Sequence, residues 1–191
     1  MRQFLIIFSL LFSCSKTFSQ LNLDVDKIPD KDSTTIFCWP TYMDSLLGLK
    51  PISESNNIIE LRLYQIEMVG AKCKTICFNG KSWTGEIMTT LFYDKDSSKT
   101  LNTNLDFNRI LDTLNQKGIF NLPDQKFLTL DGSVDDGSNY CISYKVGKKT
   151  RSYDFSNPDI YYTWYEKNKL VKELESYISI INIFDRLYRP K

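Results

Sequence analysis

The fold is decided by residues 107–158, which begin with FNRILDTLNQKGIFNLPD at residues 107–124. Asn104 or Asp106 can cap a helix whose apolar residues recur at steps of three and four. Gly118 can close that helix, and Pro123 prevents it from resuming. The pattern predicts a helix over residues 107–117, with a buried face made of Phe107, Ile110, Leu111 and Leu114.

Two strand-like runs complete this stretch. Residues 140–146 alternate between apolar and polar side chains, Gly147 marks a turn, and residues 150–155 return, which is the pattern of a β-hairpin. A short strand is also predicted at residues 127–130. Asn157 and Pro158 fit the cap and first position of a helix. We expect that helix to run to the C-terminus, because an apolar stripe recurs at Leu170, Leu174, Tyr177, Ile181, Phe184 and Tyr188.

Residues 58–93 predict three further antiparallel strands. Apolar and polar residues alternate from Ile58, and Asn79-Gly80, the strongest short signal for a hairpin, stands between two strand-like runs. Residues 94–100 favour a solvated loop and residues 20–57 an irregular leader. The sequence therefore predicts one α+β domain over residues 58–191, with an antiparallel sheet built from two hairpin regions and two helices packed on one face.

The N-terminus has the features of a secretory signal peptide. Arg2 precedes an apolar run over residues 4–12, and a polar stretch then leads to Ser19, after which we expect cleavage. The alternative is a lipobox-like Leu11-Phe12-Ser13-Cys14, in which Cys14 would carry a lipid. No later segment approaches the roughly 20 apolar residues of a spanning helix. We expect export to the periplasm or the cell exterior, with an outer-membrane lipoprotein as the alternative.

The composition excludes several classes of function. Cleavage would remove Arg2 and Lys16 from 24 basic side chains and none of the 23 acidic ones, so the mature chain is nearly neutral and does not favour nucleic acid as a partner. The chain has no histidine. This removes Ser-His and Cys-His nucleophiles and the usual zinc ligand sets. Mechanisms that use carboxylates alone, such as those of glycosidases, stay open.

Four cysteines remain after Cys14, an even number that suits disulfides in an exported protein. Cys73 and Cys77 would be about 13 Å apart on one extended strand, which is too far for a bridge between them. The alternative is that several are small buried apolar residues. The candidates for disulfides are Cys38, Cys73, Cys77 and Cys141.

Two groups of residues are candidates for binding. The loop at residues 131–137 crowds Asp131, Asp135 and Asp136 into one turn, which would suit calcium, but loops of this kind more often use Asp and Gly for turn geometry. An aromatic cluster could stack on sugar rings or form an interface, although helical spacing favours a core role. Its members are Tyr161, Tyr162, Trp164 and Tyr165. No motif indicates a cofactor.

Several short motifs resemble a diffuse group of exported Bacteroidota proteins of unknown function. They are GIFNLPD at residues 118–124, Asp131-Gly132, Tyr140 and YDFSNP at residues 153–158, together with an export-signal ending at residues 17–20. The resemblance implies an exported α+β domain and brings no catalytic residues. Our leading hypothesis is a monomeric, non-catalytic binding or interaction protein of the envelope, with an envelope protein or a glycan as partner. The alternative is a carboxylate-dependent hydrolase acting on glycans.

Overall fold

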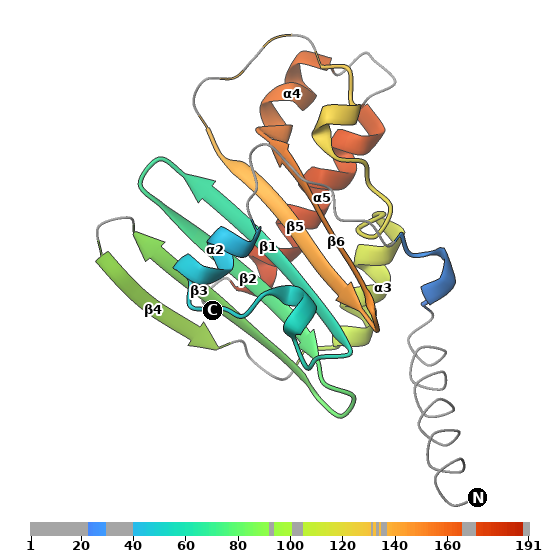
Figure 1. The fold of residues 1–191 in the computed structure, drawn as a ribbon. Coiled ribbons are helices and arrows are strands. Elements are labelled where there is room, and N and C mark those ends of the chain that lie inside the picture. The colour runs from blue at the N-terminus through green and yellow to red at the C-terminus, as the bar shows by residue number, and fades with distance from the viewer. Residues whose placement is uncertain are drawn as a thin grey trace, which may run out of the picture.

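The computed structural model describes residues 23–29, 40–91, 94–100, 105–130, 132, 134, 137–165 and 171–188. Six strands form one antiparallel sheet in the order β4-β3-β2-β1-β5-β6 (Figure 1). The strands are β1 Ile59–Glu67, β2 Gly70–Phe78, β3 Trp83–Leu91, β4 Asp94–Thr100, β5 Asn139–Val146 and β6 Lys149–Ser156. Together with the helices described below, this sheet confirms the predicted α+β class.

Strand β1 joins the two predicted hairpin regions into a single sheet. It pairs with β2 on one side and with β5 on the other, so that Leu63 lies opposite both Lys74 and Ile142. The hairpin at Asn79 is confirmed, but its turn differs from the two-residue form. Only Gly80 has a positive φ, +94°, and the Asn79 side chain accepts backbone hydrogen bonds from Lys81 and Ser82. An Asx turn therefore closes a four-residue loop.

Three helices lie against one face of the sheet. They are α3 Phe107–Gln116, α4 Pro158–Tyr165 and α5 Val171–Leu187, and Figure 1 shows α5 passing behind the strands. Helix α3 begins at its predicted cap, since the Asp106 carboxylate accepts from the Arg109 amide at 3.1 Å. The main core joins these helices to β1, β5 and β6 through residues that include Leu63, Leu111, Ile142, Phe155, Tyr177 and Phe184.

The opposite face of the sheet is covered by α2 Pro40–Leu46, which Figure 1 shows in front of the strands. Beneath it lies a second, smaller core made of Met43, Tyr64, Ala71, Cys73, Met88 and Cys141. The segment assigned in the sequence to an irregular leader thus contributes a helix and buried side chains. Leu23 and Ile28, which flank the short 3₁₀ helix Val25–Lys27, are buried in the main core, and Ile52 in the 3₁₀ helix Ile52–Glu54 is buried as well.

Three local predictions were wrong. Residues 94–100 form the edge strand β4 and not a loop, because an edge strand buries little and accommodates charged residues. Residues 127–130 form no strand, and the 3₁₀ helix η3 Gln125–Phe127 stands there instead. The predicted single C-terminal helix is two helices, α4 and α5, which pack against each other with the Tyr162 hydroxyl 3.3 Å from a Glu175 carboxylate oxygen.

None of the described helices is both long enough and apolar enough to cross a membrane.

Candidate functional site

Residues 118–124, between α3 and η3, are hydrogen-bonded to the sheet and to α5 through their backbone carbonyls. Gly118 allows the turn out of α3 with a φ of +79°. The carbonyls then accept hydrogen bonds from three buried tyrosines and one arginine. The pairs are Tyr153 to Ile119 at 2.7 Å, Tyr144 to Phe120 at 3.0 Å, Arg151 to Leu122 at 2.8 Å, and Tyr177 to Pro123.

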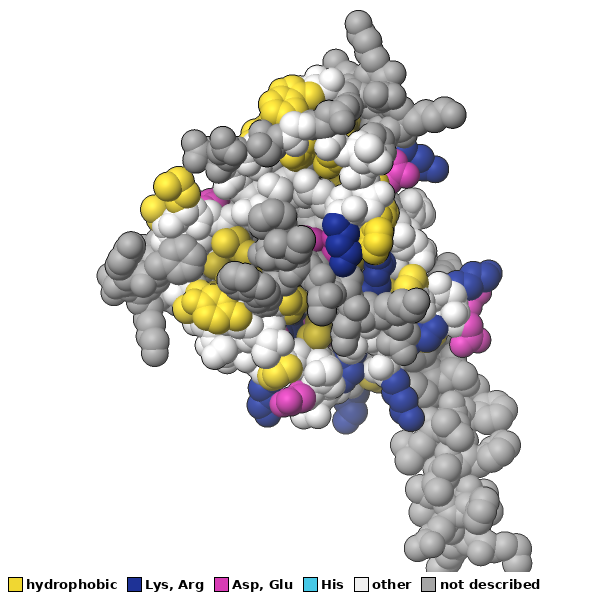
Figure 2. Space-filling view, turned by 45° about the horizontal axis from the view of Figure 1, so that its top comes forward, with side chains coloured by type: hydrophobic (Ala, Val, Ile, Leu, Met, Phe, Trp, Pro, Cys, Tyr) yellow, Lys and Arg dark blue, Asp and Glu magenta, His cyan; other side chains and the backbone are white. Residues whose placement is uncertain are grey.

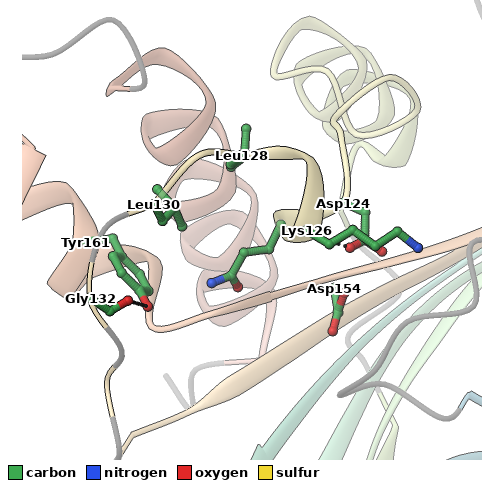
Figure 3. Close-up of a pocket in the computed structure, with 8 residues that line it drawn as sticks. Asp124, Lys126, Leu128, Leu130, Gly132, Asp154 and Tyr161 are labelled. Carbon is green, nitrogen blue, oxygen red and sulfur yellow. Dashed lines mark hydrogen bonds between the residues drawn. The ribbon is translucent and has the colours of Figure 1, made fainter.

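This segment leads into a pocket beside the edge strand β6, to which it contributes Asp124. The pocket has a volume of about 220 Å³ and lies between η3, β6 and the start of α4 (Figure 3). It is lined by Asp124, Gln125, Lys126, Leu128, Leu130, Gly132, Asp154 and Tyr161. Gln125 holds η3 against the strand, because its side-chain oxygen accepts from the Ser156 amide. The pocket is therefore framed by backbone that is hydrogen-bonded to the sheet.

Asp124 lies at one end of the pocket (Figure 3), which Asp154 also lines. Asp154 alternates along β6 with Tyr153 and Phe155 of the main core, so its side chain points to the other side of the strand. Asp124 is only 1% exposed, and its Oδ1 accepts from the Lys126 amide at 3.2 Å, which caps η3. Its other oxygen, Oδ2, is buried and has no hydrogen-bond partner among the described residues. Asp154 comes from β6 and is 4% exposed. A buried carboxylate oxygen that lacks a donor is energetically unfavourable, so this end of the pocket is suited to a donor from outside.

The aromatic cluster predicted from the sequence does not form one exposed platform. Tyr161 belongs to the main core and lines the pocket, with its hydroxyl 3.2 Å from the Gly132 carbonyl. Trp164 is 56% exposed and meets Tyr161 edge-on, with 5.6 Å between ring centroids. Tyr162 is half-buried against α5, and the side chain of Tyr165 lies outside the described residues. Tyr161 and Trp164 thus belong to the pocket and its rim.

The calcium candidates Asp131, Asp135 and Asp136 lie outside the described residues. Within the described part of the chain, no group of three or more acidic or cysteine side chains is placed to hold a metal ion.

Of the disulfide candidates, Cys73 and Cys77 are free thiols. No disulfide therefore joins two cysteines within the described ranges. Cys141 is buried and disulfide-bonded. Cys38, and the lipidation candidate Cys14, lie outside the described residues.

A second polar group lies on the other face of the sheet, sealed under α2. Arg62 on β1 pairs with Asp44 and with Glu60, each at 2.5 Å, and the Tyr64 hydroxyl donates to Asp44. All four residues are buried. Burial is the largest influence on the pKa of Tyr64 and raises it far above the usual value, so the hydroxyl stays a donor. This cluster links α2 to the sheet.

The sequence analysis missed Asp124, Asp154 and Arg62. Asp124 carried a local signal, because a Pro-Asp pair after a helix end is typical of a side chain that caps its own turn. Asp154 and Arg62 carried none, since both sit at the polar positions of alternating strands, which predict exposure to solvent. Arg62 is buried because α2 covers its side of the sheet.

A scan against protein-family models matches no family, and a search of curated proteins finds no significant match.

Proposed function

We propose that the protein is an exported, non-catalytic binding protein of the periplasm or cell surface, and that it takes a small part of its ligand into the pocket beside β6. The observation that carries the proposal is Asp124, whose buried Oδ2 has no hydrogen-bond partner among the described residues and which lines a pocket whose backbone is hydrogen-bonded to the sheet. Binding residues are often found on loops that a rigid scaffold positions. The signal-like N-terminus supports export.

The size of the pocket supports binding of one chemical group over enclosure of a whole molecule. Small-molecule sites usually measure about 300–1,000 Å³, and this pocket measures about 220 Å³. The rest of a ligand would then lie outside the pocket, near Trp164, which is exposed and contacts the lining residue Tyr161. On the face seen in Figure 2, hydrophobic side chains form separate patches among polar and charged ones. That distribution favours a local site over one broad apolar interface.

The test is capture of a ligand on immobilised mature protein from envelope extract, followed by mass spectrometry of what elutes. Asp124→Asn should lose the ligand, whereas Asp159→Asn, which removes the same charge from an exposed position on α4, should retain it. The eluted molecule should have the same mass as in untreated extract. Equal recovery from both variants would contradict the proposed site.

The alternative function, a carboxylate-dependent hydrolase acting on glycans, is favoured by one observation. Asp124 and Asp154 line the same pocket, and glycosidases act through two carboxyl groups that flank the scissile bond. Chromogenic glycosides would separate the two proposals. Turnover by the wild-type protein that disappears in both Asp124→Asn and Asp154→Asn would establish the hydrolase and overturn the non-catalytic assignment.

A further inference from the structure

We propose that the pocket beside β6 binds a primary ammonium group carried on an aliphatic chain, such as the side chain of a lysine residue. The inference depends on the proposed binding function and adds the chemistry of the ligand. It starts from Asp124, which lines the pocket and whose buried Oδ2 has no donor among the described residues. An ionised carboxylate can only accept hydrogen bonds, so the missing partner is a donor, and a cationic donor forms the stronger bond.

The charges in the pocket favour a cation. Its lining includes two aspartates, Asp124 and Asp154, and one lysine, Lys126, and the Asp124 carboxylate is the one that lies on the η3 side of β6. The Lys126 nitrogen lies 5.1 Å from the centroid of the Phe127 ring. In Figure 3 it is turned to the side of Asp124 that faces away from Leu130 and Tyr161. The space between the Asp124 carboxylate and these apolar side chains therefore has a negative end with an apolar wall.

The shape of the site favours an ammonium over a guanidinium group. A guanidinium pairs best with both oxygens of a carboxylate at once. In Asp124 the Lys126 amide already occupies Oδ1, so a single oxygen is left for the ligand. A compact ammonium needs only that one oxygen, and its alkyl chain can pack on Leu128, Leu130 and the Tyr161 ring, which line the same pocket.

Isothermal titration calorimetry on the mature wild-type protein tests the inference with three probes. These are the capped amino acids Nα-acetyl-lysine amide, its uncharged counterpart Nα-acetyl-norleucine amide, and Nα-acetyl-arginine amide. We expect saturable binding of the lysine probe, none of the norleucine probe, and binding of the arginine probe at least about tenfold weaker. Asp124→Asn keeps an oxygen for the Lys126 amide and removes the charge. We expect it to weaken the lysine probe by about tenfold or more, because loss of one partner of a buried charge pair exceeds the 1.4 kcal/mol of a tenfold change.

Asp159→Asn is the matched control and should bind the lysine probe as the wild type does. If Asp124→Asn fails to fold, the comparison of lysine and norleucine probes on the wild type still decides the question. Wild-type protein that binds neither probe, or binds both equally, overturns the inference. If envelope capture succeeds while the lysine probe gives no heat, the binding function stands and the cationic ligand is wrong. If the lysine probe binds while no envelope ligand is captured, the pocket chemistry stands and the proposed function is wrong.

Discussion

Asp44 on α2 and Arg62 on β1 form a buried ion pair, with 2.5 Å between Asp44 Oδ1 and Arg62 Nη1. The two residues are 18 positions apart, and the same guanidinium also donates to the Lys50 carbonyl at 2.8 Å. The pair therefore fixes α2 and the chain that follows it to the middle of the sheet.

Asp44→Ala should lower the free energy of unfolding by about 1–3 kcal/mol, because it leaves the buried Tyr64 hydroxyl and part of the Arg62 guanidinium without an acceptor while Glu60 still pairs with Arg62. Urea unfolding at pH 7 measures the loss. Lys27→Ala is the control, since Lys27 and Asp24 form an exposed pair at 2.8 Å that should contribute nothing measurable. Equal effects of the two substitutions would show that the buried pair does not hold α2.

Stability should fall in acid because of Glu60. Burial raises the pKa of this carboxyl, but the Arg62 charge and hydrogen bonds from Ser55 and Asn57 together lower it below its ordinary value of 4.5. A carboxyl whose folded pKa is depressed stabilises the folded state above its unfolded pKa, and that stabilisation is lost as pH falls through the folded value. The unfolding free energy should therefore decline below about pH 4.5, and less steeply in Glu60→Gln. Urea unfolding at pH 7, 5, 4 and 3 provides the comparison.

Asp44 provides a control, because its pKa is shifted in the opposite direction to that of Glu60. Burial raises its pKa, and this outweighs the lowering by the Tyr64 hydrogen bond and Arg62. A raised folded pKa means that the folded state takes up the proton first on acidification, which partly offsets the loss at Glu60. As the pH falls, the unfolding free energy of Asp44→Asn should therefore decrease more steeply than that of the wild type. That of Glu60→Gln should decrease less steeply. Between pH 6 and 8 all three proteins should be nearly constant, because the chain has no histidine.

Local sequence patterns correctly predicted those elements whose conformation is set by hydrogen bonds within the same short segment. Asn79-Gly80 gave the hairpin between β2 and β3 because its turn closes on its own side chain. Asp106 and Gly118 gave both ends of α3 for the same reason. Residues 94–100 were misassigned, because whether a charged segment becomes an edge strand depends on a neighbouring strand with open hydrogen-bonding groups, which local sequence does not contain.

Burial on the second face of the sheet could not be predicted from β1 alone. Glu60, Arg62 and Tyr64 alternate with Ile59, Leu61 and Leu63, and that alternation predicts one solvated face. The face is instead covered by α2, so the polar side chains pair with one another. The pocket was missed likewise, because Asp124 and Asp154 are brought together only by packing of η3 on β6.

Arg151→Ala should loosen residues 118–124, which lead into the pocket at Asp124. The guanidinium donates to the Leu122 carbonyl at 2.8 Å and to the Phe120 carbonyl at 3.3 Å, and its carbon lies 5.0 Å from the Tyr153 ring centroid. Hydrogen bonds from a charged donor are worth about 1.5–3 kcal/mol, so a loss of that size is expected in urea unfolding. Amide hydrogen exchange at residues 118–124 should also become faster. Lys148→Ala, in an exposed position on the same hairpin, should change neither measurement.

The cysteines should differ sharply in reactivity. Cys73 is fully buried, and burial raises the pKa of its thiol well above the usual value. Burial likewise raises the pKa of the half-buried Cys77 to about 12. At pH 8 the thiolate of Cys77 should then be on the order of a thousandfold scarcer than that of an exposed cysteine, so native iodoacetamide labelling should be slow at both sites. Both should label rapidly in urea without reductant.

A non-reducing peptide map should find Cys141 in a disulfide, with Cys38 as the expected partner, because Cys73 and Cys77 are free and Cys14 precedes the predicted cleavage site. A labelled Cys141 would contradict this pairing, and fast native labelling of Cys77 would show that its thiol is not shielded by the sheet.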